Sequence, residues 1–190
     1  DYEWLDYNGD GRMDLVSIGD GYRRFLNEGS NTWTSFDIGP FYLYGTVDVG
    51  DFDFDNVPDL LASGFFPDPN SEALSIWNLG SNSNYSQQLI SGIEATQWGD
   101  FNNDGFLDIF IGKSGLEAEE NRKNLLYVNQ GDGTFSEQGK SYGLDHAGYA
   151  VNATFFDYDR DGDLDMYLVN QGPEKYQGGD AEYMRYEVHE

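Results

Sequence analysis

The sequence predicts an all-β repeat protein whose units are the blades of a β-propeller. Three observations lead to this prediction: a nine-residue acidic pattern that occurs four times, a short apolar run after each copy, and a hairpin-like turn sequence after three of the runs. The copies begin at residues 6, 51, 100 and 157, so they lie 45, 49 and 57 residues apart. About four strands in an interval of this length are typical of propeller blades.

The acidic pattern is D-x-[D/N]-x-D-[G/N]-x-x-D, and its copies run Asp6–Asp14, Asp51–Asp59, Asp100–Asp108 and Asp157–Asp165. Carboxylates at alternate positions repel one another at neutral pH, so such a loop is stable only when something neutralises it. A hard cation that takes about six to eight oxygen ligands suits these donors, and calcium suits them best. We therefore expect up to four calcium ions, one in each loop. Asp/Asn/Gly surface turns without metal are the alternative.

Each ion is expected to bind the side chains at loop positions 1, 3, 5 and 9 and the main-chain carbonyl at position 7. The predicted ligands of the first two loops are Asp6, Asn8, Asp10, the Arg12 carbonyl and Asp14, followed by Asp51, Asp53, Asp55, the Val57 carbonyl and Asp59. Those of the last two loops are Asp100, Asn102, Asp104, the Phe106 carbonyl and Asp108, followed by Asp157, Asp159, Asp161, the Asp163 carbonyl and Asp165.

The sixth position of each loop has to turn sharply, and we expect a positive φ there. In three loops the residue at this position is a glycine, namely Gly11, Gly105 or Gly162. The second loop has Asn56, and Asn is the next most tolerant residue of this conformation. Because Asn56 and the nearby Pro58 both alter the turn, the second site is expected to be the weakest.

The loops are not EF-hands, because that motif needs a Glu at position 12 between two helices. Position 12 is here Ser17, Ala62, Ile111 or Leu168. The runs after the loops (LVSIG, LLASG, IFIGK and MYLVN) are short, apolar and rich in branched side chains, which predicts buried strands. Hairpins are predicted at FLNEGSNTW (25–33), IWNLGSNSNY (76–85) and LYVNQGDGTF (126–135), where Asn and Gly supply the turn chemistry.

This combination of acidic loop and strand resembles the FG-GAP or VCBS repeat of integrin alpha-subunit propellers and of many secreted bacterial proteins. The third and fourth units, NLLYVNQGDGTFSEQGKSYGL and FFDYDRDGDLDMYLVNQGP, are most similar to the group that includes cartilage acidic protein and the UnbV-type proteins. The resemblance covers nearly the whole chain and implies that residues 1–190 form a single propeller segment, with units that start near residues 6, 51, 100 and 157. It also implies an extracellular protein braced by calcium and used for adhesion, ligand binding or as a scaffold.

Propellers of this family usually close with seven blades, and at about 50 residues per blade they need about 350 residues. The chain has 190 residues and four loops. We therefore expect a partial, four-blade segment of a larger propeller, with the remaining blades supplied by the rest of the protein or by another chain. A small four-bladed propeller is the alternative.

The composition agrees with a secreted calcium-binding protein. The chain has 35 Asp and Glu against 10 Lys and Arg, a formal net charge of −25, which four calcium ions would offset only in part. This charge argues against a nucleic-acid partner, whose phosphates need a basic surface. No apolar run approaches the length of about 18 residues that a membrane span needs. Cysteine is absent, but external calcium concentrations suit such loops, so we expect an extracellular or cell-surface location.

The sequence offers no catalytic constellation. Its two histidines are His146, in a Gly-rich stretch, and His189, and it lacks zinc, nucleophile-elbow and phosphate-loop motifs. We therefore expect a binding or adhesion module and not an enzyme, with a protein or polysaccharide partner. Two alternatives remain: a structural subunit of a cell-surface complex or filament, and part of a carbohydrate-active enzyme such as a polysaccharide lyase.

Aromatic residues are abundant, with 14 Tyr, 13 Phe and 4 Trp. Those in loops outside the repeats are candidates for a recognition surface, and they are Phe41, Tyr42, Tyr44, Phe65, Phe66 and Tyr176. Packing between blades is the alternative role for these side chains. The sequons at Asn84 and Asn152 would permit N-glycans in a eukaryotic secretory pathway.

Overall fold

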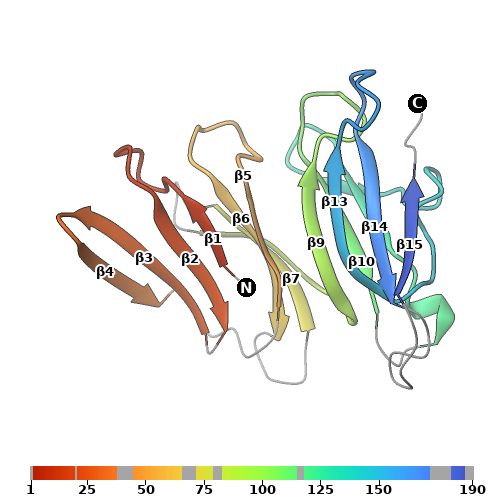
Figure 1. Ribbon diagram of the computed structural model, residues 1–190, viewed down its shortest axis with the longest axis horizontal. Coiled ribbons are helices and arrows are strands. Elements are labelled where there is room, and N and C mark those ends of the chain that lie inside the picture. The colour runs from red at the N-terminus through yellow and green to blue at the C-terminus, as the bar shows by residue number, and fades with distance from the viewer. Residues whose placement is uncertain are drawn as a thin grey trace. The chain divides into compact units, whose positions relative to one another are not determined.

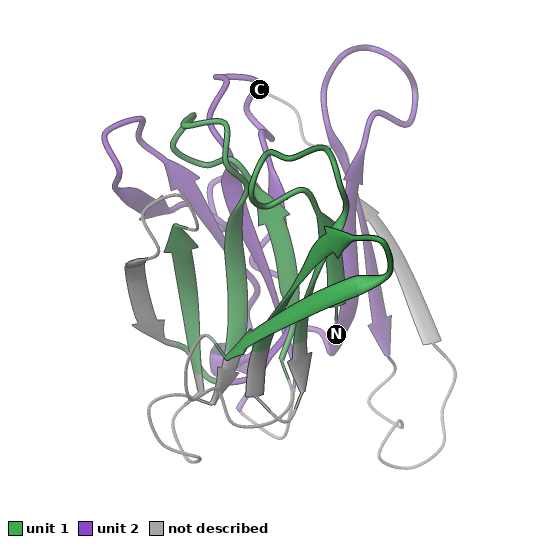
Figure 2. Ribbon diagram, turned by 90° about the vertical axis from the view of Figure 1, so that its left-hand side faces the viewer, with its two compact units in different colours: residues 1–91 green, residues 92–190 purple. Residues whose placement is uncertain are grey.

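The computed structural model confirms an all-β chain. It describes residues 2–19, 21–37, 45–65, 72–78, 83–114, 118–171 and 181–186. The chain divides into two compact units, residues 1–91 and 92–190, and each contains two small antiparallel sheets (Figure 2). Among the described residues, no helix is long and apolar enough to cross a membrane.

Unit 1 contains two four-stranded sheets, and in both of them each strand pairs with the next one along the chain (Figure 1). Sheet A consists of β1 (Tyr2–Leu5), β2 (Asp14–Gly19), β3 (Gly21–Gly29) and β4 (Thr32–Asp37). Sheet B consists of β5 (Val47–Gly50), β6 (Asp59–Phe65), β7 (Glu72–Asn78) and β8 (Ser83–Leu89).

Unit 2 has the same organisation. Sheet C consists of β9 (Ile93–Gly99), β10 (Asp108–Lys113), β11 (Leu125–Asn129) and β12 (Phe135–Glu137), and a short 3-10 helix, η1 (Glu119–Asn121), lies between β10 and β11. Sheet D contains three described strands, which are β13 (Ala150–Phe156), β14 (Asp165–Gln171) and β15 (Ala181–Tyr186).

The apolar runs form the second strand of each sheet, as the sequence predicts. β2, β6, β10 and β14 all begin at the ninth loop position, and each pairs with a strand on both sides. Every residue of β10 is buried. Each sheet begins with the strand that precedes the acidic loop, so the loop connects the first strand to the second.

The three predicted hairpins are also confirmed, because β3 pairs with β4, β7 with β8 and β11 with β12, all antiparallel. Gly29 and Gly131, which follow the Asn of the first and third hairpins, have φ of 79° and 71°. A positive φ is strained for a residue with a Cβ, and this explains the glycines.

Alternation along the strands gives each sheet two faces. We call the face that carries the first residue after the loop the leading face, and this residue is Leu15, Leu60, Ile109 or Met166. The opposite face, which we call the trailing face, carries the next residue, which is Val16, Leu61, Phe110 or Tyr167. In each unit the core forms where the leading face of the second sheet packs on the trailing face of the first.

In unit 1 the core contains Leu5 and Val16 from the trailing face of sheet A. Val47, Leu60 and Ala62 cover them from the leading face of sheet B. Leu60 and Ala62 are fully buried. At about 25 cal/mol per Å² of apolar surface, this burial is a main source of the stability of the unit.

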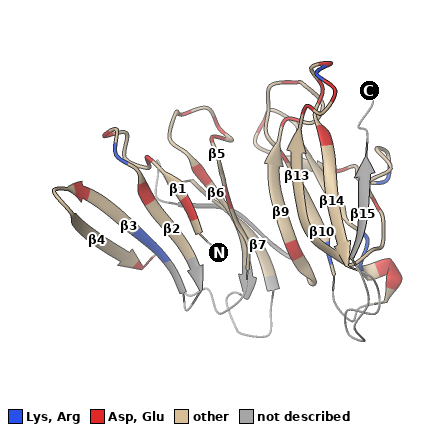
Figure 3. Cartoon of the chain, in the orientation of Figure 1, with Lys and Arg blue, Asp and Glu red and all other residues tan. Residues whose placement is uncertain are grey.

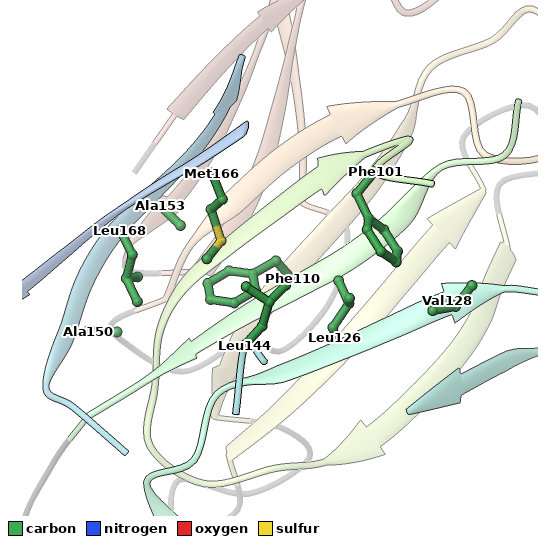
Figure 4. Close-up of a cluster of buried hydrophobic side chains, with 9 residues drawn as sticks. All are labelled: Phe101, Phe110, Leu126, Val128, Leu144, Ala150, Ala153, Met166 and Leu168. Atoms are coloured by element: carbon green, nitrogen blue, oxygen red, sulfur yellow. The ribbon is translucent and has the colours of Figure 1, made fainter. Parts of the chain in front are cut away.

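In unit 2 the same faces meet (Figure 4). Phe110 and Leu126 of sheet C lie against Met166 and Leu168 of sheet D, and all four are fully buried. The remaining members of the cluster are Phe101, Val128, Leu144, Ala150 and Ala153.

Two glycines let sheets C and D approach closely. A Cβ on Gly99 would lie 2.9 Å from the ring of Phe155, and one on Gly112 would lie 2.9 Å from the Cβ of Ala150. Gly112 is also hemmed in by Ala95 of its own sheet, at 3.2 Å. Larger side chains at these positions would push the two sheets apart.

Candidate metal centre

The four acidic loops occupy equivalent places in the four sheets. Loop 1 (6–14), loop 2 (51–59), loop 3 (100–108) and loop 4 (157–165) each run from the first strand of a sheet into the second. Figure 3 shows that acidic residues gather in these connections. Most residues at positions 3 to 6 are exposed, whereas the residue at position 9 is buried in every loop.

The carboxylate at position 1 holds the turn from the inside in loops 1 to 3. Asp6 accepts hydrogen bonds from the backbone N–H groups of Asp10 at 3.0 Å and Gly11 at 2.7 Å. Asp51 accepts the equivalent pair at 3.1 and 3.0 Å, and Asp100 accepts it at 3.0 and 2.9 Å. Each carboxylate therefore points into its own turn.

Positions 3 and 5 each accept the N–H group two residues ahead. In loop 3 the side-chain oxygen of Asn102 accepts from Asp104 at 3.1 Å, and the carboxylate of Asp104 accepts from Phe106 at 2.8 Å. The equivalent bonds in the other three loops measure between 2.7 and 3.3 Å. These short-range bonds favour a tight turn over a regular strand.

The predicted positive φ at position 6 is confirmed in all four loops, with values of 83°, 65°, 91° and 100° for Gly11, Asn56, Gly105 and Gly162. Position 4 has the same conformation, which the sequence does not predict. Its φ values are 71°, 62°, 56° and 66° for Gly9, Phe54, Asn103 and Arg160. Phe and Arg carry no sequence signal for this conformation, which costs an ordinary residue about 1–2 kcal/mol.

The carboxylate at position 9 is buried and bonded to main-chain N–H groups. Asp108 is 1% exposed, and it accepts from Phe101 at 3.3 Å and from Asn129 at 2.8 Å. Asp14 has the equivalent two bonds, at 3.2 and 2.8 Å. Asp59 and Asp165 accept from the residue at loop position 2, at 3.1 and 2.8 Å. Position 9 thus joins the loop to the sheet.

In sheets A, B and C, an asparagine near the end of the third strand also bonds to the acidic loop. The side-chain amide of Asn129 donates to the carbonyl of Leu107 at 3.2 Å, and its oxygen accepts from the N–H of Gly131 at 3.0 Å. Asn27 makes the same two bonds in sheet A, both at 3.1 Å. In sheet B the amide of Asn78 donates to the carboxylate of Asp53 at 2.5 Å. The hairpin sequence therefore also supports the neighbouring acidic loop.

Burial makes the charge of Asp108 unfavourable by itself. Desolvation raises the pKa of Asp108 to about 7, against the lowering effect of the hydrogen bonds from Asn129 and Phe101. The nearby carboxylates of Asp104 and Asp100 raise the pKa further. A cation placed among these oxygens would reverse this balance, because opposite charge favours the ionised form.

Two loops bring three carboxylates together. In loop 2 one oxygen each from Asp51, Asp53 and Asp55 lie within 4.8 Å of one another. In loop 4 the same holds for Asp157, Asp159 and the buried Asp165. These hard oxygen donors fit an ion such as calcium.

Comparison with protein-family models gives one match, to the FG-GAP-like repeat, over residues 6–62 and 100–168. Together these regions cover about two thirds of the chain. The chain belongs to the FG-GAP-like repeat family. Each matched region begins at position 1 of an acidic loop and contains two loops of one unit. A search of curated proteins found no match. The narrower resemblance to the cartilage acidic protein and UnbV-type group has no support in these comparisons.

The two FG-GAP loops with asparagine at position 3 differ from the other two. The amide nitrogen of Asn8 donates to Asp10 at 2.8 Å, and that of Asn102 donates to Asp104 at 2.9 Å. In loop 1 the guanidinium of Arg12 also pairs with Asp10 and donates to the carbonyl of Asn27 at 2.6 Å. Desolvation opposes a lower pKa of Asp10, but the bonds from Asn8 and Arg12 outweigh it.

Loop 4 departs from the shared FG-GAP geometry at position 1. Its carboxylate, Asp157, accepts the N–H of Arg160 at position 4, at 2.6 Å. Desolvation and the charges of Asp161 and Asp165 raise the pKa of Asp159. Neighbouring carboxylates therefore repel one another in loop 4.

The structure places all sixteen side-chain ligands predicted for calcium in these loops, and it brings three together in loop 2 and three in loop 4. The carbonyls predicted at position 7 belong to residues whose N–H groups close the turn: Arg12, Val57, Phe106 and Asp163. The binding of an ion by any of the twenty residues stays a prediction.

The other candidate residues are placed only in part. Phe41, Tyr42, Tyr44, Phe66, Tyr176 and His189 lie outside the described residues, as do the side chains of Phe65 and Asn84. Asn152 is exposed on β13. The carbonyl of His146 accepts the N–H of Asn124 at 3.1 Å, so the main chain of His146 has a structural role.

Proposed function

We propose that the chain is a calcium-stabilised, extracellular FG-GAP module that binds a protein or glycan partner in adhesion or surface assembly. The observation that carries the calcium part is the convergence of carboxylates, three within 4.8 Å in loop 2 and three in loop 4. Family membership supports the binding part, because FG-GAP repeats generally serve in binding modules.

The proposed role of calcium is structural. An ion held by Asp51, Asp53 and Asp55 would neutralise loop 2 at the entry to β6, and one held by Asp157 and Asp159 with Asp165 would do so at the entry to β14. Binding by the folded state alone adds the binding free energy to the stability. The chain contributes the turn that brings these oxygens together, and the ion would hold that turn in place.

The proposed location follows from the calcium supply. Extracellular calcium-binding modules have dissociation constants of about 0.1–1 mM, a range that external calcium reaches and cytosolic calcium does not. A formal charge of −25 also keeps calcium-free loops under repulsion. We therefore place the protein outside the cell or on its surface.

We also propose that the four sheets are blades of a larger propeller, of about seven blades as in related proteins. The support is that one packing arrangement occurs in both units: the leading face of a sheet covers the trailing face of the sheet before it. Radial repetition of this packing is what builds a propeller.

Binding in the presence and absence of calcium tests the main proposal. A panel of neutral and acidic polysaccharides and extracellular-matrix proteins is presented to the chain with calcium and with a chelator, together with the variant Asp161→Ala. Binding that disappears with the chelator and weakens in the variant is expected. Equal binding under all three conditions, or no binding to any member of the panel, contradicts the proposal.

One observation favours a second candidate, a structural subunit of an assembly. The leading face of sheet A carries large exposed aromatic side chains: Tyr2 is 63% exposed, Trp4 is 49% exposed and Trp33 is 45% exposed. Trp4 and Trp33 contact each other edge to face, with ring centroids 6.2 Å apart. On the same face, Trp4 is paired with Leu15 on β2, and Leu15 is paired with Phe25 on β3.

Sheet C has an aromatic pair at the positions equivalent to these two tryptophans. Trp98 and Phe135 hold the same places in sheet C, with ring centroids 6.5 Å apart, and Trp98 is only 6% exposed. In sheets B and D the leading face is covered by the trailing face of another sheet. We propose that a second copy of the chain covers Trp4 and Trp33 in the same way, with the trailing face of its sheet D.

Sedimentation of the chain in calcium over a wide range of protein concentration tests this candidate. Self-association that is lost in the double variant Trp4→Ser/Trp33→Ser is expected. The variant Met13→Ser, which changes an exposed residue of loop 1, is the control and should still associate. A chain that stays monomeric at every concentration contradicts it.

A further inference from the structure

The side chain of Asn103 connects loop 3 to loop 4. The amide nitrogen of Asn103, at position 4 of loop 3, lies 3.2 Å from the carbonyl oxygen of Gly162 and 3.2 Å from the carboxylate of Asp163. These two residues occupy positions 6 and 7 of loop 4. The bonded residues are 59 and 60 positions apart in the sequence, and the bonds connect the loop of sheet C to the loop of sheet D.

The conformation of loop 3 presents Asn103 to its neighbour. The residues on both sides, Asn102 and Asp104, bond within the loop through their side chains. Asn103 has a φ of 56°, which turns its side chain away from this interior. Asparagine accepts this conformation better than most residues with a Cβ.

Among the four loops, only loop 3 has an amide side chain at position 4. The equivalent residues are Gly9, Phe54 and Arg160. The contact is thus a feature of the pair of loops 3 and 4 and not of the repeat in general.

The contact reaches the part of loop 4 that has to be ordered for an ion. In loops 1 to 3 the N–H of position 6 is held by the carboxylate at position 1. In loop 4 the carboxylate of Asp157 bonds at position 4. Asn103 holds the backbone at position 6 from outside, through the carbonyl of Gly162, and it also fixes Asp163, whose carbonyl is a predicted ligand.

We propose that Asn103 is a positioning residue that couples the calcium sites predicted for loops 3 and 4. When loop 3 holds an ion, its turn is fixed and the amide of Asn103 stays in place against loop 4, so loop 4 binds calcium more tightly. Coupling of this kind is reciprocal. The inference rests on the calcium function proposed above.

The expected size of the effect is modest. Both bonds are exposed and at the long end of the hydrogen-bond range. We therefore expect the low end of typical couplings between sites, about a fivefold change in affinity.

Calcium titration followed by amide resonances tests the proposal, because the glycines at position 6 report on single loops. Gly105 reports on loop 3 and Gly162 on loop 4. The variant Asn103→Gly removes the amide but accepts the same φ. It should raise the calcium midpoint at Gly162 about fivefold. The matched control Phe54→Gly changes the same position of loop 2 and should leave the midpoint at Gly162 unchanged.

A double-mutant cycle separates coupling from local damage. Asp104→Ala disables loop 3 and should raise the midpoint at Gly162 by a similar factor, although Asp104 does not touch loop 4. In the double variant Asn103→Gly/Asp104→Ala the two effects should not add. The coupling is overturned if neither substitution changes the calcium midpoint at Gly162, or if the two changes in that midpoint add fully in the double variant. Either result would leave the proposed calcium function intact. Glycine resonances that do not respond to calcium in any loop of the unchanged protein overturn the calcium function and the coupling together.

Discussion

The main-chain N–H of Asn129 donates to the carboxylate of Asp108 at 2.8 Å, from β11 to the first residue of β10. Asp108 ends an acidic loop and Asn129 begins a hairpin turn, so one hydrogen bond joins the two recurring sequence features of this chain. Asn27 and Asp14 stand in the same relation in sheet A. The loop and the hairpin act as one structural element.

The side chain of Asn129 adds two further hydrogen bonds to this connection, so its removal should destabilise unit 2. The side chain is 3% exposed, and Asn129→Ala would leave the carbonyl of Leu107 and the N–H of Gly131 without their partner. A loss of about 1–3 kcal/mol is expected, measured by urea unfolding at constant calcium. Ser141→Ala on the exposed surface is the control and should change stability by less than about 0.5 kcal/mol. Equal stability of the two variants would show that the side-chain hydrogen bonds of Asn129 do not contribute to stability.

The close approach of sheets C and D gives a second prediction. Gly112→Ala would place its Cβ 2.9 Å from that of Ala150, between two strands that cannot yield easily. We expect a loss of about 1–3 kcal/mol from overpacking. In a double-mutant cycle, Ala150→Gly should cost less stability in the Gly112→Ala background than in the unchanged protein. If the two substitutions change the free energy of unfolding additively, residues 112 and 150 are not in contact.

Much of this arrangement can be predicted from sequence, because the causes are local. A glycine or asparagine at position 6 predicts a positive φ, and Gly11 and Asn56 both have it. The apolar runs after the loops predict buried strands, and Phe110 in the middle of β10 is fully buried.

The features that escaped prediction depend on contacts between distant residues. The pairing of Asn129 with Asp108 depends on the register of β10 and β11, which turn sequences do not specify. Phe54 and Arg160 adopt a left-handed conformation that neither residue type favours, because the turn on both sides of them imposes it. The contact of Asn103 with loop 4 needs two sheets to be packed before it exists.

Repulsion within loop 4 predicts that a substitution there changes the melting temperature differently with and without calcium. One carboxylate oxygen of Asp159 lies within 4.8 Å of one oxygen each of Asp157 and Asp165. Desolvation and the charges of Asp161 and Asp165 raise the pKa of Asp159. Asp159→Asn removes one charge but keeps an oxygen donor, as in loops 1 and 3. The melting temperature of the calcium-free protein should rise, and its increase on adding calcium should shrink. The opposite change in calcium-free protein would show that repulsion does not limit this loop.

Thermal unfolding with and without calcium is the most direct test of the central claim that the acidic loops are cages for a hard dication. Each site filled at about 100 times its dissociation constant should add about 2.7 kcal/mol to the folded state. We predict a melting temperature that rises steeply with calcium, falls in excess chelator, and responds much less to magnesium. The same melting temperature in chelator and in saturating calcium would contradict the account.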